Sequence, residues 1–359
     1  MHMEKQRRAV ISGTGSYIPD HVISGQHFMD AAFFENGTRL DKTNAEIIQK
    51  FSDITDIVER RYVQQGQVNS DIAVIAAREA IKDAAIDPET LDYIIFAHNF
   101  GDMRPGGNRI DQLPALAAKV KEQLGIRNPD CIGYDILFGC PGWVQGAIQA
   151  RYYIESGDAS RVLVIGSETL SRIIDPHDRD SMIFSDGAGA VIFEATEDGA
   201  TGILSHRAQT YAVDYAGLLT MGKSSFPLDP SDNYYMKMNG RKLYEFAVTT
   251  VPGVVKQALD KAGVHITDVR MVLIHQANGK MDQAIMKRLF KLYGLDDMPE
   301  KLTPMTISWL GNSSVATIPT LLDLVRRGKV EGYRVTGGDL VVFASVGAGM
   351  HINAFVHRF

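Results

Sequence analysis

Short apolar runs alternate with amphipathic stretches along the chain, and this alternation predicts strands that are each followed by a helix. β-Branched residues dominate the runs, which is typical of strands buried in a largely parallel sheet. The stretches between them are rich in alanine and place apolar residues at helical spacing. The predicted strands cover residues 9–12, 93–98, 134–138, 162–166, 190–194, 271–275 and 340–345. The predicted helices cover residues 71–84, 143–156, 244–262, 281–293 and 315–327.

Two segments of the chain repeat one order of features without a gap. Residues 77–98 and residues 255–276 each contain a helical stretch, a polar turn with an aspartate, an apolar strand and a histidine. A second pair follows in the same order, since residues 139–142 open one predicted helix and residues 311–314 open another. Two pairs in matching order predict an internal duplication. We place one α/β half in residues 1–195 and the other in residues 196–359.

The duplication draws attention to three residues at equivalent strand ends and helix starts, where α/β folds usually bind ligands. Cys140 follows a predicted strand and precedes a helix, whose positive end lowers the pKa of a thiol. His275 ends a strand, from which it can donate a proton or a hydrogen bond. Asn312 stands at the equivalent turn of the second half. Their shared position in the repeat favours a common site over three unrelated structural residues.

Each of these residue types more commonly has a structural role than a catalytic one. A free cysteine is most often a buried apolar side chain, and we assign Cys131 to that role. A histidine that ends a strand is most often a satisfied core residue, and His98 is our candidate for this. An asparagine before a helix is a good N-cap.

Composition and charge exclude several classes of protein. With 45% hydrophobic and 22% charged residues, the chain of 359 residues has the composition of a typical globular protein. A net charge of −6 argues against nucleic acid or an anionic membrane as a general partner. Two cysteines cannot form a disulfide framework, which suits a reducing compartment. The first apolar run stops at Gly13, and no stretch approaches the roughly 20 apolar residues of a membrane helix. We expect a cytoplasmic protein.

The glycine-rich stretches do not match nucleotide-binding motifs. Residues 13–17 and 347–350 lack the third glycine of a dinucleotide fingerprint, and residues 185–190 lack the Gly-Lys-Ser/Thr of a phosphate loop. The chain also has no His-Glu-x-x-His motif. We therefore expect neither nucleotide-dependent chemistry nor a catalytic metal.

At these motifs the sequence resembles the beta-ketoacyl-acyl-carrier-protein synthase III family of the thiolase superfamily. The likeness spans nearly the whole chain. It is carried by residues 13–19, 139–143, 175–179, 186–190, 275–278, 311–319 and 347–349. The resemblance implies an α/β, thiolase-like fold of two duplicated halves in αβαβα layers, and a homodimer.

The resemblance also implies a catalytic triad of Cys140, His275 and Asn312. Cys140 would attack an acyl thioester while the backbone amides of Cys140 and Ala348 hold the oxyanion. A malonyl thioester on acyl-carrier protein would then lose carbon dioxide while His275 and Asn312 stabilise the enolate. This chemistry needs no external cofactor, because coenzyme A or the carrier's phosphopantetheine arrives with the substrate.

Departures from the family pattern concern the acyl donor. The family's coenzyme-A-binding Trp and Arg precede a Thr-Gly-Ile-Arg-Glu-Arg run, which reads Thr-Asp-Ile-Val-Glu-Arg at residues 55–60 with no Trp upstream. Residues 101–111 are an insertion. Leu113 aligns with a phenylalanine that closes the partner's acyl pocket in the family, so we expect donors longer or more branched than acetyl. Trp143 and Phe184 complete the predicted substrate pocket.

The resemblance further implies a docking surface for acyl-carrier protein on the helix after His275. Lys280, Lys287 and Lys291 share one face of that helix. Such a face is solvated by default, but Lys280 matches a basic position of the family that meets the acidic carrier.

Two other functions compete with this interpretation. One is a different enzyme of the superfamily, such as a thiolase, a hydroxymethylglutaryl-coenzyme-A synthase or an ester-forming acyltransferase. A biosynthetic thiolase uses a second cysteine late in the chain, and none follows Cys140. Ester formation uses the same acyl-cysteine and stays open. The other is a non-catalytic partner subunit, which retention of all three triad residues disfavours.

Overall fold

Two mixed β-sheets form the body of the computed structural model, which describes residues 7–106 and 109–359. The first sheet has the order β1 (Arg8–Tyr17), β11 (Asp186–Thr196), β10 (Arg161–Thr169), β6 (Tyr93–Ala97) and β9 (Ile132–Ile136). The second sheet has the order β12 (Gly202–Thr210), β17 (His351–Arg358), β16 (Leu340–Gly347) and β15 (Val269–Ile274).

The two sheets share one pairing pattern. In the first, β1 and β10 flank β11 in antiparallel fashion and β6 runs parallel to β10. In the second, β12 and β16 flank β17 in antiparallel fashion and β15 runs parallel to β16. Among the described residues, only the first sheet continues beyond this pattern, through the parallel edge strand β9. The predicted duplication of an α/β half is confirmed by this repeated topology.

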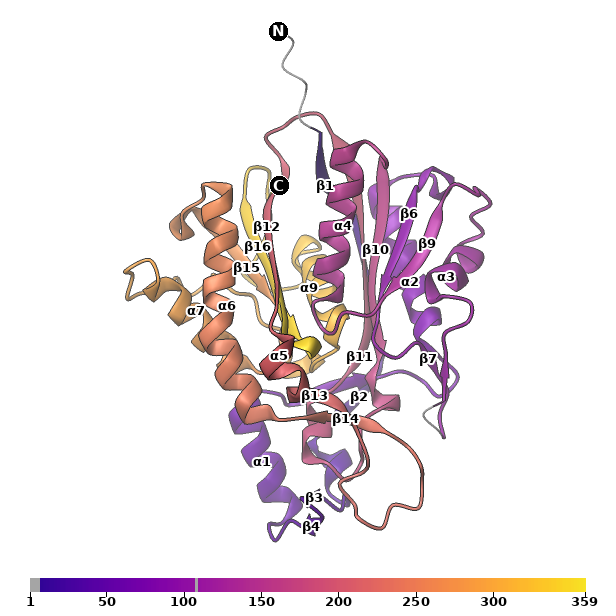
Figure 1. Ribbon diagram of the computed structural model, residues 1–359, viewed down its shortest axis with the longest axis vertical. Coiled ribbons are helices and arrows are strands. Elements are labelled where there is room, and N and C mark those ends of the chain that lie inside the picture. Colours follow the sequence, from indigo (N-terminus) through magenta and orange to yellow (C-terminus); the bar gives the residue numbers. More distant parts are fainter. Residues whose placement is uncertain (1–6, 107–108) are drawn as a thin grey trace.

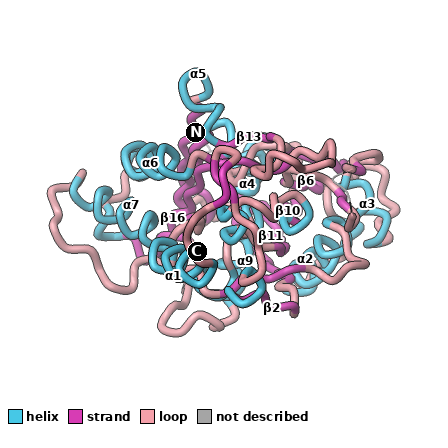
Figure 2. Tube along the Cα trace, turned by 90° about the horizontal axis from the view of Figure 1, so that it is seen from below, coloured by secondary structure: helices cyan, strands magenta, loops and turns pink. Residues whose placement is uncertain are grey.

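Helices form three layers around the two sheets (Figures 1 and 2). The outer layer of the first sheet is α2 (Asn69–Ala84) and α3 (Leu116–Leu124). Between the sheets lie α4 (Gly142–Ser156) and α9 (Thr317–Arg326). The outer layer of the second sheet is α6 (Gly240–Ala262) and α7 (Gly279–Lys291). The order of layers is therefore αβαβα, as predicted.

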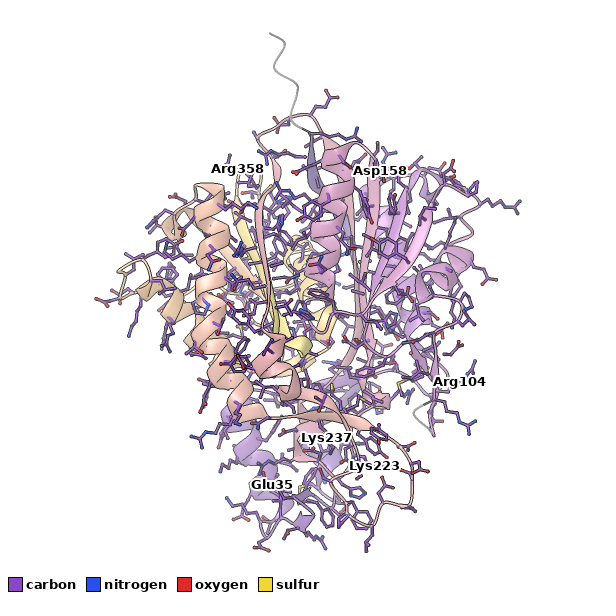
Figure 3. All side chains as sticks on the ribbon, viewed as in Figure 1. Glu35, Arg104, Asp158, Lys223, Lys237 and Arg358 are labelled. Atoms are coloured by element: carbon purple, nitrogen blue, oxygen red, sulfur yellow. The ribbon has the colours of Figure 1, made fainter. Side chains whose placement is uncertain are left out.

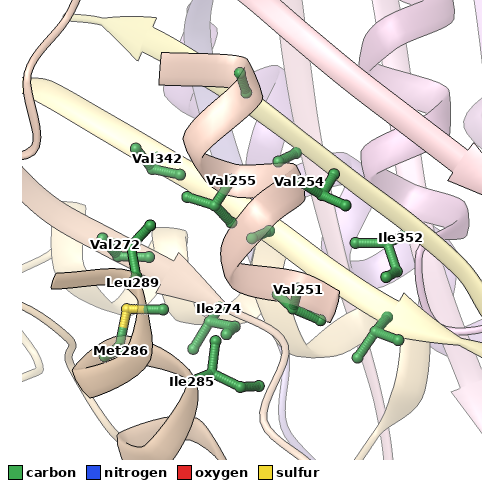
Figure 4. Close-up of a cluster of buried hydrophobic side chains, with 14 of the residues drawn as sticks. Val251, Val254, Val255, Val272, Ile274, Ile285, Met286, Leu289, Val342 and Ile352 are labelled. Carbon is green, nitrogen blue, oxygen red and sulfur yellow. The ribbon is translucent and has the colours of Figure 1, made fainter. Parts of the chain in front are cut away.

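Apolar packing fixes the strand that leads to His275. One face of α6 buries Val251, Val254 and Val255 against the second sheet, where Val272 and Ile274 belong to β15 (Figure 4). Burial of each such side chain contributes about 1.5–3 kcal/mol. Since α7 adds its own apolar face to the same cluster, both ends of the segment around His275 are anchored.

Smaller elements gather at one end of the layers, at the lower end in Figure 1. They include the two-stranded pairs of β2 (His21–Ser24) with β5 (Glu59–Tyr62), β3 (Phe34–Glu35) with β4 (Thr38–Arg39), and β13 (Leu219–Gly222) with β14 (Tyr235–Met238). Helix α1 (Asn44–Thr55) lies beside them, and α5 (Ala212–Tyr215) and α8 (Ile307–Leu310) are single turns. The predicted insertion contains β7 (Asp102–Met103) and β8 (Ile110–Asp111), and its residues 107–108 lie outside the described residues.

An ion-pair cluster fastens β14 to this end of the molecule. Lys237 Nζ lies 2.5 Å from Asp175 Oδ2 and 3.0 Å from Asp178 Oδ2. Figure 3 places Lys237 and Lys223 here, on the segments below the layered body. Lys237 lies between Met236 and Met238, which line the cavity beside Cys140. The ion-pair cluster therefore also holds these two methionines in place.

Among the described residues, no helix combines the length and apolarity needed to cross a bilayer.

Candidate active site

Cys140 lies in the turn between β9 and α4, directly before the N-cap residue of that helix, Pro141. Close backbone approach defines this turn. A Cβ atom on Gly347 would lie 2.6 Å from Cys140 N, and one on Gly139 would lie 2.7 Å from Ala348 N. Gly139 also has a positive φ of 62°. Glycine at both positions therefore lets the 347–349 turn pack closely against the cysteine turn. This packing brings Ala348 beside Cys140.

The protonation state of Cys140 differs from the prediction. The sequence predicts a lowered thiol pKa because the cysteine precedes a helix. Burial instead raises the pKa of Cys140 to about 11, and the nearby Glu168 carboxylate adds to that rise. A hydrogen bond from Ser314 Oγ to Cys140 Sγ, 3.3 Å long, acts in the opposite direction. Desolvation is the largest of these effects on the pKa, so the resting group is a neutral thiol.

His275 is buried at the carboxyl end of β15, and its backbone amide donates to Ala344 O at 2.8 Å. Burial lowers the pKa of His275 to about 4. The imidazole is therefore neutral at pH 7. Its Nδ1 finds no hydrogen-bond partner among the described residues.

Asn312 is held by backbone pairing with the 183–185 segment. Its amide donates to Ile183 O at 3.0 Å, and its carbonyl accepts from Ser185 N at 2.8 Å. The side-chain Oδ1 accepts from Ser314 N at 2.8 Å. This contact fixes the amide plane and leaves the Nδ2 end as the available donor.

Cys140, His275 and Asn312 line one cavity of about 210 Å³. The structure thus brings together residues from both halves of the chain, as their repeat positions predict. Apolar side chains supply most of the remaining wall. Its four methionines are Met221, Met236, Met238 and Met281. Methionine adapts its shape readily, which suits a flexible apolar ligand.

The three predicted pocket residues have different positions. Phe184 lines the cavity. Trp143 does not, and its assignment to the pocket is wrong: it is 1% exposed in the core between the sheets, where its Nε1 donates to Val164 O. The first turn of α4 directs it away from Cys140 into that core. Leu113 is 89% exposed, and its predicted role in a partner's pocket stays a prediction.

Two residues assigned to structural roles are structural. Cys131 is buried, and burial raises its pKa. His98 is buried too, with Nε2 3.1 Å from Asp135 Oδ2 and Nδ1 accepting from Gly101 N at 3.0 Å. Within residues 7–106 and 109–359, no three His, Cys, Asp or Glu side chains are arranged to hold a metal.

Sequence reasoning missed three polar residues beside Cys140, namely Asn99, Glu168 and Ser314. Glu168 stands near the end of β10, where a carboxylate that follows an apolar run is a usable signal. Ser314 stands in the same glycine-asparagine turn as Asn312. Asn99 follows His98 directly, and its contacts depend on tertiary structure alone.

Lys280, Lys287 and Lys291, hereafter the α7 lysines, are all exposed on that helix. The face opposite to them is buried against α6 and the second sheet. Their carrier-protein role stays a prediction.

Two family models match the chain. The model of 3-oxoacyl-[acyl-carrier-protein (ACP)] synthase III matches residues 134–212, and the model of its C-terminal part matches residues 259–359. The beta-ketoacyl-[acyl-carrier-protein] synthase III of Erythrobacter litoralis is 33% identical over 356 residues, which are 98% of this chain and 99% of the relative. The synthase III of Symbiobacterium thermophilum is 34% identical over 360 residues, covering 99% of each chain.

Solved structures show the same likeness. The 3-oxoacyl-[acyl-carrier-protein] synthase III of Aquifex aeolicus VF5 has a TM-score of 0.80 at 30% identity, covering 98% of this chain and 100% of that one. The priming beta-ketosynthase of the R1128 polyketide pathway has a TM-score of 0.80 at 25% identity, covering 100% and 98%. The predicted thiolase-like fold is confirmed by these neighbours. With this identity over almost its entire length, the chain belongs to the beta-ketoacyl-[acyl-carrier-protein] synthase III family.

Proposed function

We propose that this chain joins an acyl thioester to malonyl-acyl-carrier protein by decarboxylative condensation through an acyl-Cys140 intermediate. The observation that carries the proposal is the convergence of Cys140, His275 and Asn312 on one mostly apolar cavity in a member of this family. The product would be a beta-ketoacyl thioester, formed in fatty-acid initiation or in a specialised fatty-acid or polyketide-like pathway.

The first stage forms the acyl-enzyme. The Cys140 sulfur attacks the carbonyl carbon of the thioester. The bond between that carbon and the carrier sulfur then breaks, and the thiol proton of Cys140 leaves with the carrier thiol. The backbone N–H groups of Cys140 and Ala348 hold the oxyanion of the tetrahedral intermediate. The close packing of their two turns supports this pairing.

The second stage forms the new bond. The malonyl carboxylate leaves as carbon dioxide, and its bonding electrons form an enolate whose oxygen accepts hydrogen bonds from His275 and Asn312. The enolate carbon then attacks the acyl carbon, which releases the Cys140 thiolate for reprotonation. A neutral imidazole can donate such a hydrogen bond, and the depressed pKa of His275 favours that state. The chemistry requires no external cofactor.

The cavity best fits a donor whose acyl chain is longer or more branched than acetyl. The cavity wall includes Leu170, Phe184, Leu219 and Leu243 as well as the four methionines. Burial of each extra methylene stabilises the bound acyl group by about 0.8 kcal/mol. Both coenzyme A and acyl-carrier protein stay open as donors.

We propose a homodimer that forms across strand β9, at the edge of the first sheet. An edge strand offers unpaired backbone groups to a second copy. Its surroundings are apolar at the surface, with Ile132 49%, Leu137 61% and Leu113 89% exposed. Pairing of two copies here would bury these side chains and carry Leu113 toward the partner.

The α7 lysines are the proposed docking surface for acyl-carrier protein. They stand on the helix that follows His275 and that contributes Met281 to the cavity. Positive charge near the cavity complements an acidic carrier and speeds encounter. Both cysteines are free, which suits the reducing cytoplasm that we propose as the compartment.

Intact-protein mass spectrometry tests the acyl-enzyme. The protein is incubated with acetyl, butyryl, isobutyryl and octanoyl donors, each on coenzyme A and on acyl-carrier protein. We expect a mass increase equal to one acyl group, which Cys140→Ser abolishes. Persistence of the adduct in that variant, or its transfer to Cys131, would contradict the nucleophile assignment.

A further inference from the structure

A chain of hydrogen bonds joins a buried carboxyl group to Cys140. Glu168 is 1% exposed, and its Oε1 accepts from both Asn99 N and Asn99 Nδ2 at 2.6 Å. The same Nδ2 donates to Ser314 Oγ at 3.1 Å. Ser314 Oγ in turn donates to Cys140 Sγ at 3.3 Å. These residues come from four separate segments, so only the tertiary fold assembles the chain.

The direction of these hydrogen bonds determines whether a donor or an acceptor faces the Cys140 sulfur. Asn99 Nδ2 has two protons, one for Glu168 and one for Ser314. Because the serine oxygen accepts from Asn99, its own proton is directed to Cys140. A hydrogen bond donated to sulfur favours the thiolate over the thiol. The chain therefore opposes the desolvation that raises the pKa of Cys140.

The backbone at Ser314 provides a second, independent observation. Ser314 has a φ of 52°, in the left-handed region that serine rarely occupies. Residues are held in such conformations when their surroundings fix them, and they cluster at functional sites. Here the bond from Ser314 N to Asn312 Oδ1 fixes the residue. Its hydroxyl is thereby placed beside Cys140.

We propose that Ser314 is a catalytic residue that donates a hydrogen bond to the Cys140 thiolate, and that Asn99 and Glu168 are positioning residues that hold its hydroxyl. This inference deepens the proposed function and rests on the nucleophilic role of Cys140. It adds a thiolate-stabilising group to the proposed triad, whose other two members act on the enolate.

The charge on Glu168 is a separate effect from its role as an acceptor. Burial, together with Asp186, raises the pKa of Glu168 to about 8. Asp186 itself is buried and bonded to Ser171 and to Val63 N. An ionised Glu168 opposes the Cys140 thiolate. A neutral glutamine would still accept from Asn99, so substitution can separate charge from positioning.

The test is the pH profile of Cys140 alkylation by iodoacetamide, quantified by peptide mass spectrometry. The variants are Ser314→Ala, Asn99→Ala, their double variant and Glu168→Gln, with Ser313→Ala as the adjacent serine control. Loss of a hydrogen bond to a charged group costs about 1.5–3 kcal/mol, so we expect Ser314→Ala to lower the thiolate fraction at least about tenfold. Asn99→Ala should shift the profile in the same direction.

The double variant decides whether the two residues act as one unit. If Asn99 acts through Ser314, the double variant matches Ser314→Ala alone, because groups that share one interaction are not additive. Glu168→Gln and Ser313→Ala should show no shift toward higher pH. Additive shifts, a wild-type profile in Ser314→Ala, or an upward shift in Glu168→Gln would overturn the proposal.

Two further measurements keep the outcome clear. Thermal melting of each variant separates a local change at the thiol from loss of the fold. Alkylation needs no acyl substrate, so it reports on Cys140 independently of the condensation. Shifted profiles in a protein that forms no condensation product would support the role of Ser314 and reject the proposed function.

Discussion

The contact between the two turns at Cys140 predicts a large effect of one methyl group, added by Gly347→Ala. Gly347 has an extended backbone with φ −172°, which alanine adopts freely. The substitution therefore adds no conformational strain. Its effect would come entirely from the new Cβ atom, which would meet the backbone of the cysteine turn.

The size of the effect follows from the distances. The added Cβ would lie 2.6 Å from Cys140 N, 2.8 Å from Pro141 Cδ and 2.9 Å from Cys140 Cβ. Ordinary contact starts at 3.4 Å, so the two turns must separate by about 0.8 Å. That movement displaces the nucleophile and the Ala348 amide relative to one another. Since a misplacement near 1 Å costs about 100-fold in rate, we expect acylation to slow by about that factor.

The assay is single-turnover acylation followed by intact mass, with thermal melting in parallel. Gly253→Ala is the matched control, because Gly253 lies inside α6 and a Cβ there would meet nothing within 4 Å. The control should acylate at the wild-type rate and unfold at the same or a higher temperature, since alanine favours helix. A Gly347→Ala variant that acylates as fast as the control would show that the contact does not position the nucleophile.

Three further predictions concern the later steps. His275→Ala and Asn312→Ala should each reduce carbon dioxide release by about 100-fold to 1,000-fold and spare single-turnover acylation; equal losses in both steps would refute the division of labour. Leu113→Phe should remove the preference for longer donors, changing kcat/KM by about fourfold per methylene; an unchanged profile over acetyl, butyryl, isobutyryl and octanoyl donors would exclude Leu113 as the gate. Reversal of charge at all α7 lysines should raise the KM for malonyl-acyl-carrier protein about tenfold at low salt and less at high salt; the same KM as in Lys223→Glu would remove α7 as the docking surface.

The layered core could be predicted from the sequence because its strands are nearly continuous apolar runs. β6, β10 and β16 lie where β-branched residues cluster, and their observed ends differ from the predicted ends by only a few residues. β12 and β17 are not predicted from the sequence, because their segments, GILSHRAQT and HINAFVHR, contain too many polar residues for the alternation to stand out. The pair of β13 and β14 was also missed. These short strands are held by tertiary contacts, including the ion pairs of Lys237.

The candidate site was predictable only as far as the duplication reached. Cys140, His275 and Asn312 were found because repeated turns share one place in the fold. The methionines that line the cavity were not predicted. Met221 and Met236 belong to the pair of β13 and β14, which has no equivalent in the repeat. The Trp143 error has a related cause. A residue near a helix start can face the site or the core, and the sequence does not fix which face packs against the sheets.

One physical cause, burial among apolar side chains, accounts for both recognition of an acyl chain and the uncharged state of the site. It raises the pKa of Cys140 to about 11 and lowers the pKa of His275 to about 4. A thiolate–imidazolium pair would have to be desolvated in this cavity, and the cost of burying two charges can exceed what their mutual attraction returns. The resting enzyme therefore presents a neutral thiol and a neutral donor. In the proposed mechanism each charge that develops during the reaction has its own donor: the Ser314 hydroxyl for the thiolate, the N–H groups of Cys140 and Ala348 for the oxyanion, and His275 with Asn312 for the enolate.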